Sequence, residues 1–368
     1  MIKILLTGDL HLGKKYQKEA SDVMERYCDA RIQALQNAVV IANRENCDYF
    51  VIAGDLYDKR TGIAVLLHKQ VCNILNDFSG EAILILPGNH DYYTPDDVLW
   101  KTFEEYSGSN IRVFKKNEKY QDGNVVFYPC ICHDRISKTN ALEWLSEEIE
   151  RDSELYHIGI AHGAIEGLSY DKKQEYYLMT QQELLSCHMD AWLIGHTHIA
   201  YPSVFDNTVD QRIFNAGTPQ QTDIADGSTG EVFVLEIDEN KKITAKREQT
   251  GVIRFVKKTV VLQHGQELKE ALNFSDLEPE STSLRVELSG IALADDYDNR
   301  HQIYEDLNRS YIKADIKDEK LRKEITPEMV NKETIEGSLL NQLLNSYLED
   351  SELLNLAYDL AISCKEGV

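Results

Sequence analysis

The sequence reads ILLTGDLH over residues 4–11, where an apolar run ends in a small cluster of polar side chains. The same order recurs as FVIAGDLYD at 50–58, ILILPGNHD at 83–91, IGIAHG at 158–163 and WLIGHTH at 192–198. The apolar runs have the length and composition of buried strands, which predicts strands at 2–6, 49–53, 82–86, 156–160 and 191–194. Helical spacing between them, as at 23–39, predicts an α/β layered domain.

The polar clusters contain residue types that bind metal ions. In an open α/β sheet, ligands gather beyond the carboxyl ends of the strands, so we expect all five clusters at one rim of one sheet. Asp9 and His11 are two residues apart and would share one side of a regular extended strand. A lone histidine is more often a hydrogen-bonded structural residue, but five such clusters in this order predict a two-metal centre. Mixed carboxylate, amide and imidazole ligands suit the hydrolysis of phosphate esters.

The five clusters resemble the motifs of the calcineurin-like metallophosphoesterases. The forms Asp55-Leu56-Tyr57-Asp58 and Gly88-Asn89-His90-Asp91 are similar to those of SbcD-type DNA repair nuclease subunits within that superfamily. The stretch Asn215-Ala216-Gly217-Thr218-Pro219-Gln220 is similar to a Gly-Ser-Pro-Gln segment of the same proteins, with Thr218 in place of Ser. The motif resemblance covers residues 1 to about 225 and implies a four-layer α/β/β/α metallophosphoesterase core.

The resemblance also implies a role for each residue of the site. One ion would be held by Asp9, His11, Asp55 and His198, and the other by Asp55, Asn89, His162 and His196. The resemblance favours Mn²⁺, whereas the ligand types alone permit manganese, iron or zinc. His90 would act on the scissile phosphate, and Asp91 would orient His90. Asp58 is expected to support the site without binding metal.

The remainder of the chain predicts two further regions after a metallophosphoesterase domain at 1–252. Residues 253–322 follow a β-α-β-α-β pattern, which predicts a small α/β capping domain. Residues 323–368 predict a C-terminal helical tail of two amphipathic helices, because Thr326-Pro327 has the form of a helix start and apolar stripes follow at 335–348 and 353–361. These stripes either complete the core or dock a partner, which the resemblance identifies as the coiled coil of an SbcC-like ATPase.

Charge and cysteine usage limit the function classes. The net charge of −23 argues against a free-standing, non-specific nucleic-acid binder, but it is compatible with a DNA enzyme whose basic surface is local. The stretch 241–258 has seven basic residues and one acidic residue, and is either a solvated strand edge or a phosphate-backbone contact. Seven scattered cysteines without a C-x-x-C pair favour a reduced, cytoplasmic protein, and no signal peptide or membrane span is expected.

The resemblance therefore implies a two-metal-dependent DNA nuclease, with exo- and endonuclease activity, that hydrolyses phosphodiesters by a metal-bound hydroxide. Its expected partners are DNA and an SbcC-like ATPase, and a homodimer is compatible with the sequence. An alternative is a metal-dependent phosphoesterase that acts on a small molecule or a phosphoprotein. The phosphoprotein version is less favoured, because those enzymes resemble a Gly-Asn-His-Glu form where this chain has Asp91. A non-catalytic scaffold would be expected to lack ligands, and none of the predicted ligands is missing.

Overall fold

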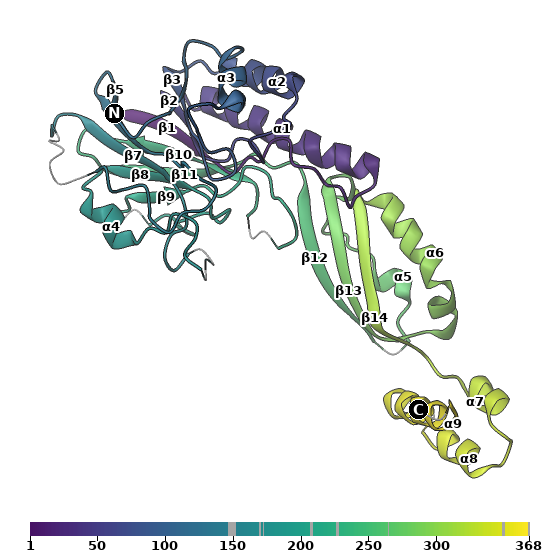
Figure 1. Cartoon of the computed structure of the whole chain (residues 1–368). Coiled ribbons are helices and arrows are strands. Elements are labelled where there is room, and N and C mark those ends of the chain that lie inside the picture. Colours follow the sequence, from purple (N-terminus) through teal and green to yellow (C-terminus); the bar gives the residue numbers. More distant parts are fainter. Residues whose placement is uncertain are drawn as a thin grey trace. The chain divides into compact units, whose positions relative to one another are not determined.

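The computed structural model describes residues 1–145, 152–168, 171, 173–206, 209–225, 228–263, 265–347 and 350–366. The chain divides into two compact units, Met1–Arg254 and Phe255–Val368 (Figure 1). The first unit contains all five polar clusters. The division of the second unit into a capping domain and a tail stays a prediction.

The first sheet has six strands in the order β11-β10-β1-β2-β3-β4. Strands β1 to β4 run parallel, and β10 pairs antiparallel with β1. The bounds are Ile2–Thr7 for β1, Tyr49–Ala53 for β2, Ala82–Leu86 for β3, Ile111–Val113 for β4, Glu231–Ile237 for β10 and Ile243–Gln249 for β11.

The second sheet has five strands in the order β5-β6-β7-β8-β9, and β6 to β9 run parallel. Its strands are β5 (Tyr120–Asp122), β6 (Val125–Cys130), β7 (Tyr156–His162), β8 (Ala191–Gly195) and β9 (Ile213–Asn215). The five predicted strands are therefore confirmed. The expectation of one rim on one sheet is wrong, because three clusters follow strands of the first sheet and two follow strands of the second.

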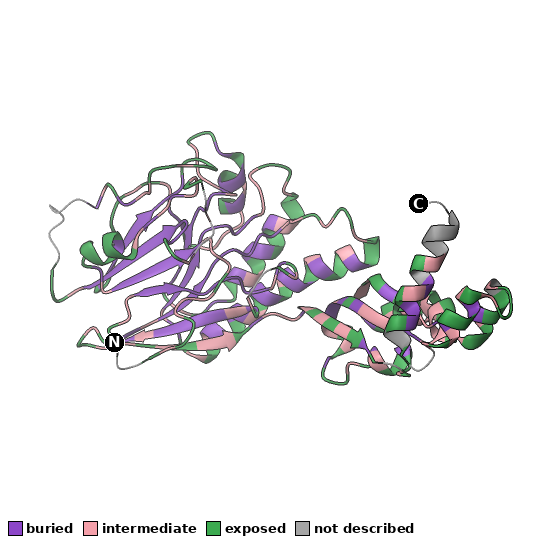
Figure 2. Ribbon diagram, turned by 90° about the horizontal axis from the view of Figure 1, so that it is seen from below, coloured by how far each residue is buried: buried purple, intermediate pink, exposed green. Residues whose placement is uncertain are grey.

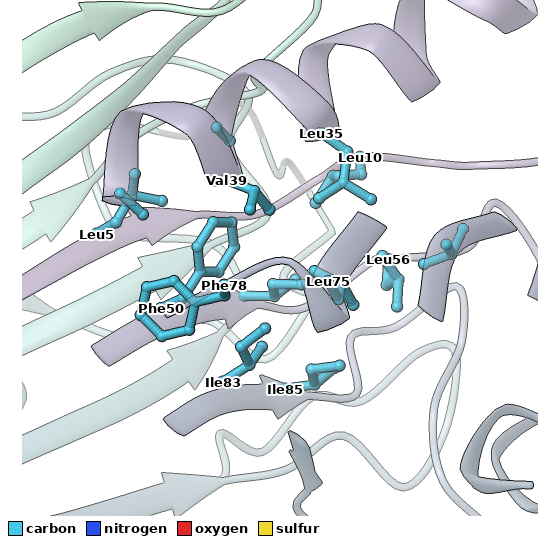
Figure 3. Close-up of a cluster of buried hydrophobic side chains, with 14 of the residues drawn as sticks. Leu5, Leu10, Leu35, Val39, Phe50, Leu56, Leu75, Phe78, Ile83 and Ile85 are labelled. Carbon is cyan, nitrogen blue, oxygen red and sulfur yellow. The ribbon is translucent and has the colours of Figure 1, made fainter. Parts of the chain in front are cut away.

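Alternation along the strands explains the layers. Leu5, Phe50 and Ile83 pack against helices on the outer face of the first sheet, as Figure 3 shows. Their neighbours in the strands, such as Ile4 and Val51, join a second core with residues of the other sheet. The outer helices are α1 (Ser21–Arg44), α2 (Val65–Asn76) and α3 (Val98–Glu104).

The second sheet is covered on its outer face by α4 (Gln181–Ser186), whose Leu184 packs in one cluster with Trp192 of β8. Most strands of both sheets are buried along their length, as Figure 2 shows. Continuous apolar runs are typical of strands that are covered on both faces. The predicted four-layer α/β/β/α core is thereby confirmed.

The second unit begins with a three-stranded sheet in the order β12-β13-β14, of which β13 and β14 run parallel. Leu268, Leu284 and Val286 form part of its core with residues of α6. The elements are β12 (Arg254–Leu262), α5 (Leu268–Ala271), a 3₁₀ turn (Pro279–Ser281), β13 (Thr282–Ala292), α6 (Ala294–Ser310) and β14 (Lys313–Lys323).

In the described part of the tail, three helices follow this sheet instead of the two that the apolar stripes predict. They are α7 (Pro327–Glu333), α8 (Leu339–Asn345) and α9 (Ser351–Glu366). The Thr326 side chain accepts a hydrogen bond from the Met329 N–H, which makes α7 a separate capped turn of helix before the first stripe. Leu348 of that stripe lies outside the described residues. Among the described helices, none is long and apolar enough to cross a membrane.

Candidate metal centre

Several residues of the polar clusters have left-handed backbone angles. Strand β1 ends at Thr7, and φ is +53° at Asp9 and +46° at His11, so the expected extended strand does not continue through these residues. Asp55 and His198 are also left-handed, with φ of +54° and +56°. Such angles cost about 1–3 kcal/mol at a residue with a side chain and concentrate at functional sites. Hydrogen bonds hold the first turn, since the Asp9 and His11 N–H groups donate to the carbonyls of Gly54 and Asp55 at 3.0 and 2.9 Å.

The first group of converging side chains is formed by Asp9, His11 and His198. The Nε2 atoms of His11 and His198 lie 3.0 Å apart, and Oδ1 of Asp9 lies 3.6 Å from Nε2 of His198. Asp55 reaches this group through Oδ2, which is 3.7 Å from Nε2 of His11.

The second group is formed by Asn89, His162 and His196. Oδ1 of Asn89 lies 3.0 Å from Nε2 of His162 and 3.3 Å from Nδ1 of His196. Asp55 reaches this group through its other oxygen, because Oδ1 is 3.5 Å from Nε2 of His162. The seven predicted metal ligands therefore lie together in two groups, and the Asp55 carboxylate lies between them.

Two glycines are required by the close approach of these side chains. A Cβ atom on Gly54, where φ is +93°, would lie 2.0 Å from Nδ1 of His162. A Cβ atom on Gly88 would lie 2.2 Å from Oδ1 of Asp55. No side chain fits at these distances, so both positions need glycine for space, and Gly54 needs it for its backbone angle as well.

Burial and mutual charge shift the pKa values of the cluster. Burial lowers the pKa of the His162 imidazole, but the Asp55 carboxylate outweighs it and raises that pKa to about 9. Burial lowers the pKa of His196 to about 3, and it lowers that of His11 well below its usual value. Burial and the charge of Asp55 raise the pKa of Asp91 to about 7. The carboxylates of Asp55 and Asp9 therefore favour positive charge beside them, which a bound divalent ion would supply.

The cluster fits divalent metal ions on three counts. Its donors are carboxylate, amide and imidazole atoms, which suit first-row transition metals. Ligand atoms about 2.1 Å from one octahedral ion lie about 3 Å apart, close to the distances between His11 and His198 and between Asn89 and His162. Oδ1 of Asp9 is buried without a hydrogen-bond partner among the described residues, as expected for an oxygen that faces an ion.

His90 is positioned differently from the expectation. Its Nδ1–H donates to the carbonyl oxygen of Asp58 at 2.9 Å. The Asp91 carboxylate instead accepts the N–H groups of Tyr57, at 3.0 Å, and Gly88, at 2.7 Å. The hydrogen bond that orients His90 is therefore made by the Asp58 carbonyl, and the expected hydrogen bond between Asp91 and His90 is not among those of the described residues. Asp91 fixes the loops after β2 and β3, and the Asp58 carbonyl orients the imidazole.

Residues other than the predicted ligands also contact the cluster. The Thr218 hydroxyl donates to the Asp9 carbonyl at 2.9 Å, which gives the stretch 215–220 a structural role beside the first cluster. The Tyr176 ring lies 5.2 Å from the His196 ring, between centroids. Asp58 Oδ1 lies 3.6 Å from Nδ1 of His11, and Asp58, His11 and His90 also place ligand atoms near one another, so a supporting role for Asp58 stays a prediction. Tyr176 lies far from every cluster in sequence, so no local pattern indicates its position.

The basic stretch 241–258 forms ion pairs with the protein's own acidic residues. Lys241 pairs with Asp190 at 3.0 Å, and Arg247 pairs with Glu231 at 3.3 Å. Lys246 pairs with Glu45. All three basic residues belong to β11 or the turn before it, and β11 is an edge strand of the first sheet. These pairings favour the solvated strand edge over a phosphate contact.

Comparison with known proteins shows the family of the chain. The profile of the calcineurin-like phosphoesterase family matches residues 2–200. The chain belongs to that family and is a metallophosphoesterase.

Two individual proteins are similar to this chain. The uncharacterized metallophosphoesterase YhaO of Bacillus subtilis (strain 168) is 24% identical over 206 residues, which are 52% of this chain and 47% of that protein. The chain thus matches about half the length of that relative. The crystal structure of TT1561 of Thermus thermophilus aligns with 68% of this chain and 99% of its own, at 13% identity and a TM-score of 0.41.

Proposed function

We propose that this metallophosphoesterase is a two-metal-dependent DNA nuclease, and that it is the nuclease subunit of an SbcC–SbcD-like repair complex. The observation that carries the two-metal part is the position of Asp55. One of its oxygens faces His162 and the other faces His11, so a single carboxylate serves both ligand groups. The proposed ligands are the seven residues of these groups, and Mn²⁺ is the proposed metal.

The residues of the chain support hydrolysis of a phosphodiester. The bound ions would act as Lewis acids on the phosphate and would lower the pKa of a water molecule. The Nδ1–H of His90 donates to the Asp58 carbonyl. The other ring nitrogen, Nε2, would therefore be the atom that protonates the leaving oxygen. His90 is partly exposed at the edge of the cluster, whereas Asp9, Asp55 and His162 are buried. His196 and His198 are half-buried as well, so a phosphate can reach His90 and one side of the ligand groups, while the carboxylate ligands stay buried.

The proposal that the substrate is DNA rests on the sequence motifs at Asp55–Asp58 and Gly88–Asp91, which are similar to those of SbcD-type nucleases. A nuclease assay with Mn²⁺ on single- and double-stranded DNA, with and without a chelator, tests it. Chelator-sensitive cleavage is the expected result. Activity on small phosphodiesters or phosphopeptides without cleavage of DNA would favour the alternative phosphoesterase instead.

The partner proposal rests on the helices of the tail. Val330, Leu344, Leu354 and Tyr358 form a small cluster of their own. Leucines and an isoleucine on other faces of α8, α9 and the turn before α8 are exposed: Ile335, Leu339, Leu343, Leu353, Leu356 and Leu360. Leu339 and Ile335 are 85% and 82% exposed. Exposed apolar side chains beside a separate small core are typical of helices that dock a partner, and we propose that this partner is the coiled coil of an SbcC-like ATPase.

Charged residues introduced at these exposed apolar positions are expected to abolish docking without unfolding the tail. Replacing Leu339 and Leu360 together by glutamate should prevent co-elution with the coiled coil in size-exclusion chromatography, because buried charge opposes apolar docking. The matched control is Val261→Glu, an exposed apolar residue of β12 at 57% exposure, which should leave co-elution intact. Hydrolysis of a small phosphodiester should be normal in both variants. Co-elution of the double variant would place the docking surface elsewhere.

A second structural feature fixes the loop that orients His90. The Arg60 guanidinium donates to Thr94 at 2.6 Å and to Asp97 at 2.8 Å, and so ties the loop after β2 to the loop after β3. Its centre lies 4.2 Å from the centroid of the Tyr92 ring. Arg60 is two residues from Asp58, whose carbonyl accepts the His90 hydrogen bond.

Arg60→Met is therefore expected to lower turnover of an oligonucleotide by about tenfold to a hundredfold, because small misplacements of a catalytic group have effects of this size. The metal content should not change. The control is Arg112→Met, which removes another arginine stacked on a tyrosine, at 4.1 Å from Tyr120, outside the cluster. Equal turnover of the two variants would mean that the Arg60 tie does not position His90.

A further inference from the structure

A buried arginine lies directly beneath the first metal-binding loop. Arg31 of α1 is 2% exposed and is among the largest fully buried side chains of the described chain. Its Nη1–H donates to the Leu10 carbonyl at 2.7 Å, and its Nε–H donates to the Tyr16 hydroxyl at 2.8 Å. The Nη2 group is buried and has no hydrogen-bond partner among the described residues.

This arrangement is unfavourable for stability alone. Arg31 has no paired carboxylate among the described residues and has an unsatisfied donor, so it loses hydration that its two hydrogen bonds do not fully replace. A buried charge is therefore weak evidence for a stabilising role, since proteins in which apolar residues replace a whole buried ion pair are often no less stable. Packing alone does not explain why an arginine occupies position 31.

The partner of Nη1 indicates what the arginine does. Leu10 separates Asp9 from His11, and the two flanking residues both have left-handed backbone. A carbonyl in such a turn points away from the strand ladder, and the Arg31 guanidinium is the side-chain donor that it meets. The hydrogen bond thereby fixes the peptide that sets the spacing of the Asp9 and His11 side chains. Tyr16 in turn fixes the guanidinium by accepting its Nε–H.

We propose that Arg31, held by Tyr16, is a positioning residue that keeps Asp9 and His11 in their metal-binding geometry through the Leu10 carbonyl. The proposal rests on the ligand groups assigned under the proposed function, and it concerns the group of Asp9, His11 and His198 alone. Residues that orient metal ligands typically change metal affinity by about 10- to 100-fold when they are replaced. A fixed positive charge near a cation has the opposite effect, because it repels the ion. If Arg31 acts through geometry, its replacement weakens metal binding. If it acts only through its charge, its replacement strengthens metal binding.

The test is calorimetric titration of the full chain with Mn²⁺, in a background that isolates the first group. Asn89→Ala removes the amide ligand of the second group, so the remaining strong site reports on Asp9, His11 and His198. In this background, Arg31→Met is expected to weaken Mn²⁺ binding about 10- to 100-fold. Arg31→Lys is expected to weaken it similarly, because an ammonium group keeps the charge but cannot reproduce the planar pair of donors.

Two further variants keep the result interpretable. Tyr16→Phe retains the ring and removes the acceptor of Nε, so a smaller loss of affinity in the same direction is expected. Arg44→Met removes an exposed arginine of the same helix, which pairs with Glu248, and should not change the affinity. Thermal unfolding of the metal-free proteins should show that Arg31→Met still folds cooperatively, with a modest loss of stability because the Leu10 carbonyl loses its donor.

Unchanged or tighter Mn²⁺ binding by Arg31→Met would overturn the proposal, and tighter binding would show that its charge is what matters. If Arg31→Met does not fold, Tyr16→Phe decides, since unchanged affinity there excludes the positioning role. A parent chain that binds no Mn²⁺ would instead overturn the ligand assignment. A parent chain that binds two ions but cleaves no DNA would overturn the nuclease proposal and leave the role of Arg31 open to the same titration.

Discussion

Asp55→Asn is expected to abolish phosphodiester hydrolysis and to leave much less than two metal ions per chain. Among the described residues, Asp55 is the carboxylate that has one oxygen near each ligand group, at 3.5 Å from His162 and 3.7 Å from His11. An asparagine of the same shape has one oxygen, so it can serve one group at most, and it removes a negative charge that favours both ions. Elemental analysis of the purified variant, together with a hydrolysis assay, measures both effects.

The control for this prediction lies at the other end of the same strand. Asp48 precedes β2 and accepts the Lys3 N–H at 2.7 Å, so Asp48→Asn makes the same chemical change outside the cluster. It should retain both metal ions and normal activity. Two bound ions and normal hydrolysis in Asp55→Asn would show that the carboxylate does not bridge the two groups.

The layers of the fold could be predicted from the sequence because their cause is local. Strand β2 is buried at all five positions, and a strand covered on both faces must be apolar throughout. The positions of the polar clusters follow, since each begins where an apolar run ends. The two-sheet arrangement is not local: β3 and β7 have similar apolar runs, and nothing within either run states to which sheet it belongs. The resemblance to a known family implies two β layers but does not assign these strands to them, so one sheet is the expectation for all five clusters.

The geometry of the site depends on backbone angles that residue types do not specify. Left-handed backbone is uncommon at residues other than glycine, even though aspartate and histidine adopt it more often than most, so an extended path through Asp9 and His11 is the natural expectation. The left-handed turns exist because neighbouring segments hold them, through Gly54, Arg31 and Thr218. These residues lie far from position 9 in sequence, and their contacts become visible only in the folded chain.

The partner of His90 illustrates the same limit. A carboxylate next to a working imidazole is a reasonable candidate to orient it, and Asp91 follows His90 directly. In the fold, consecutive side chains at this turn point in different directions. The Asp91 carboxylate accepts the N–H groups of Tyr57 and Gly88, and the His90 imidazole donates to a main-chain carbonyl. Because every residue has a carbonyl, sequence alone cannot single out that of Asp58.

His90→Ala is expected to lower turnover by about 10²–10⁴-fold, the range for a residue that transfers a proton to or from the reacting group. Metal content and substrate affinity should be retained, because the imidazole belongs to neither ligand group. His133→Ala is the control, since it removes an exposed histidine of the same unit that lies outside all five clusters. Loss of metal from His90→Ala would identify His90 as a ligand and contradict its assignment to the phosphate.

Two measurements separate proton transfer by His90 from a general loss of structure. Added imidazole should partly restore the turnover of His90→Ala, because the small base can occupy the space that the side chain leaves. The loss should also depend on the leaving group: a nitrophenolate needs little protonation, whereas the alkoxide released from DNA needs a full proton. We therefore expect a large defect on an oligonucleotide and a smaller one on a nitrophenyl phosphodiester. Equal defects on the two substrates would mean that His90 binds the phosphate and does not serve the leaving oxygen.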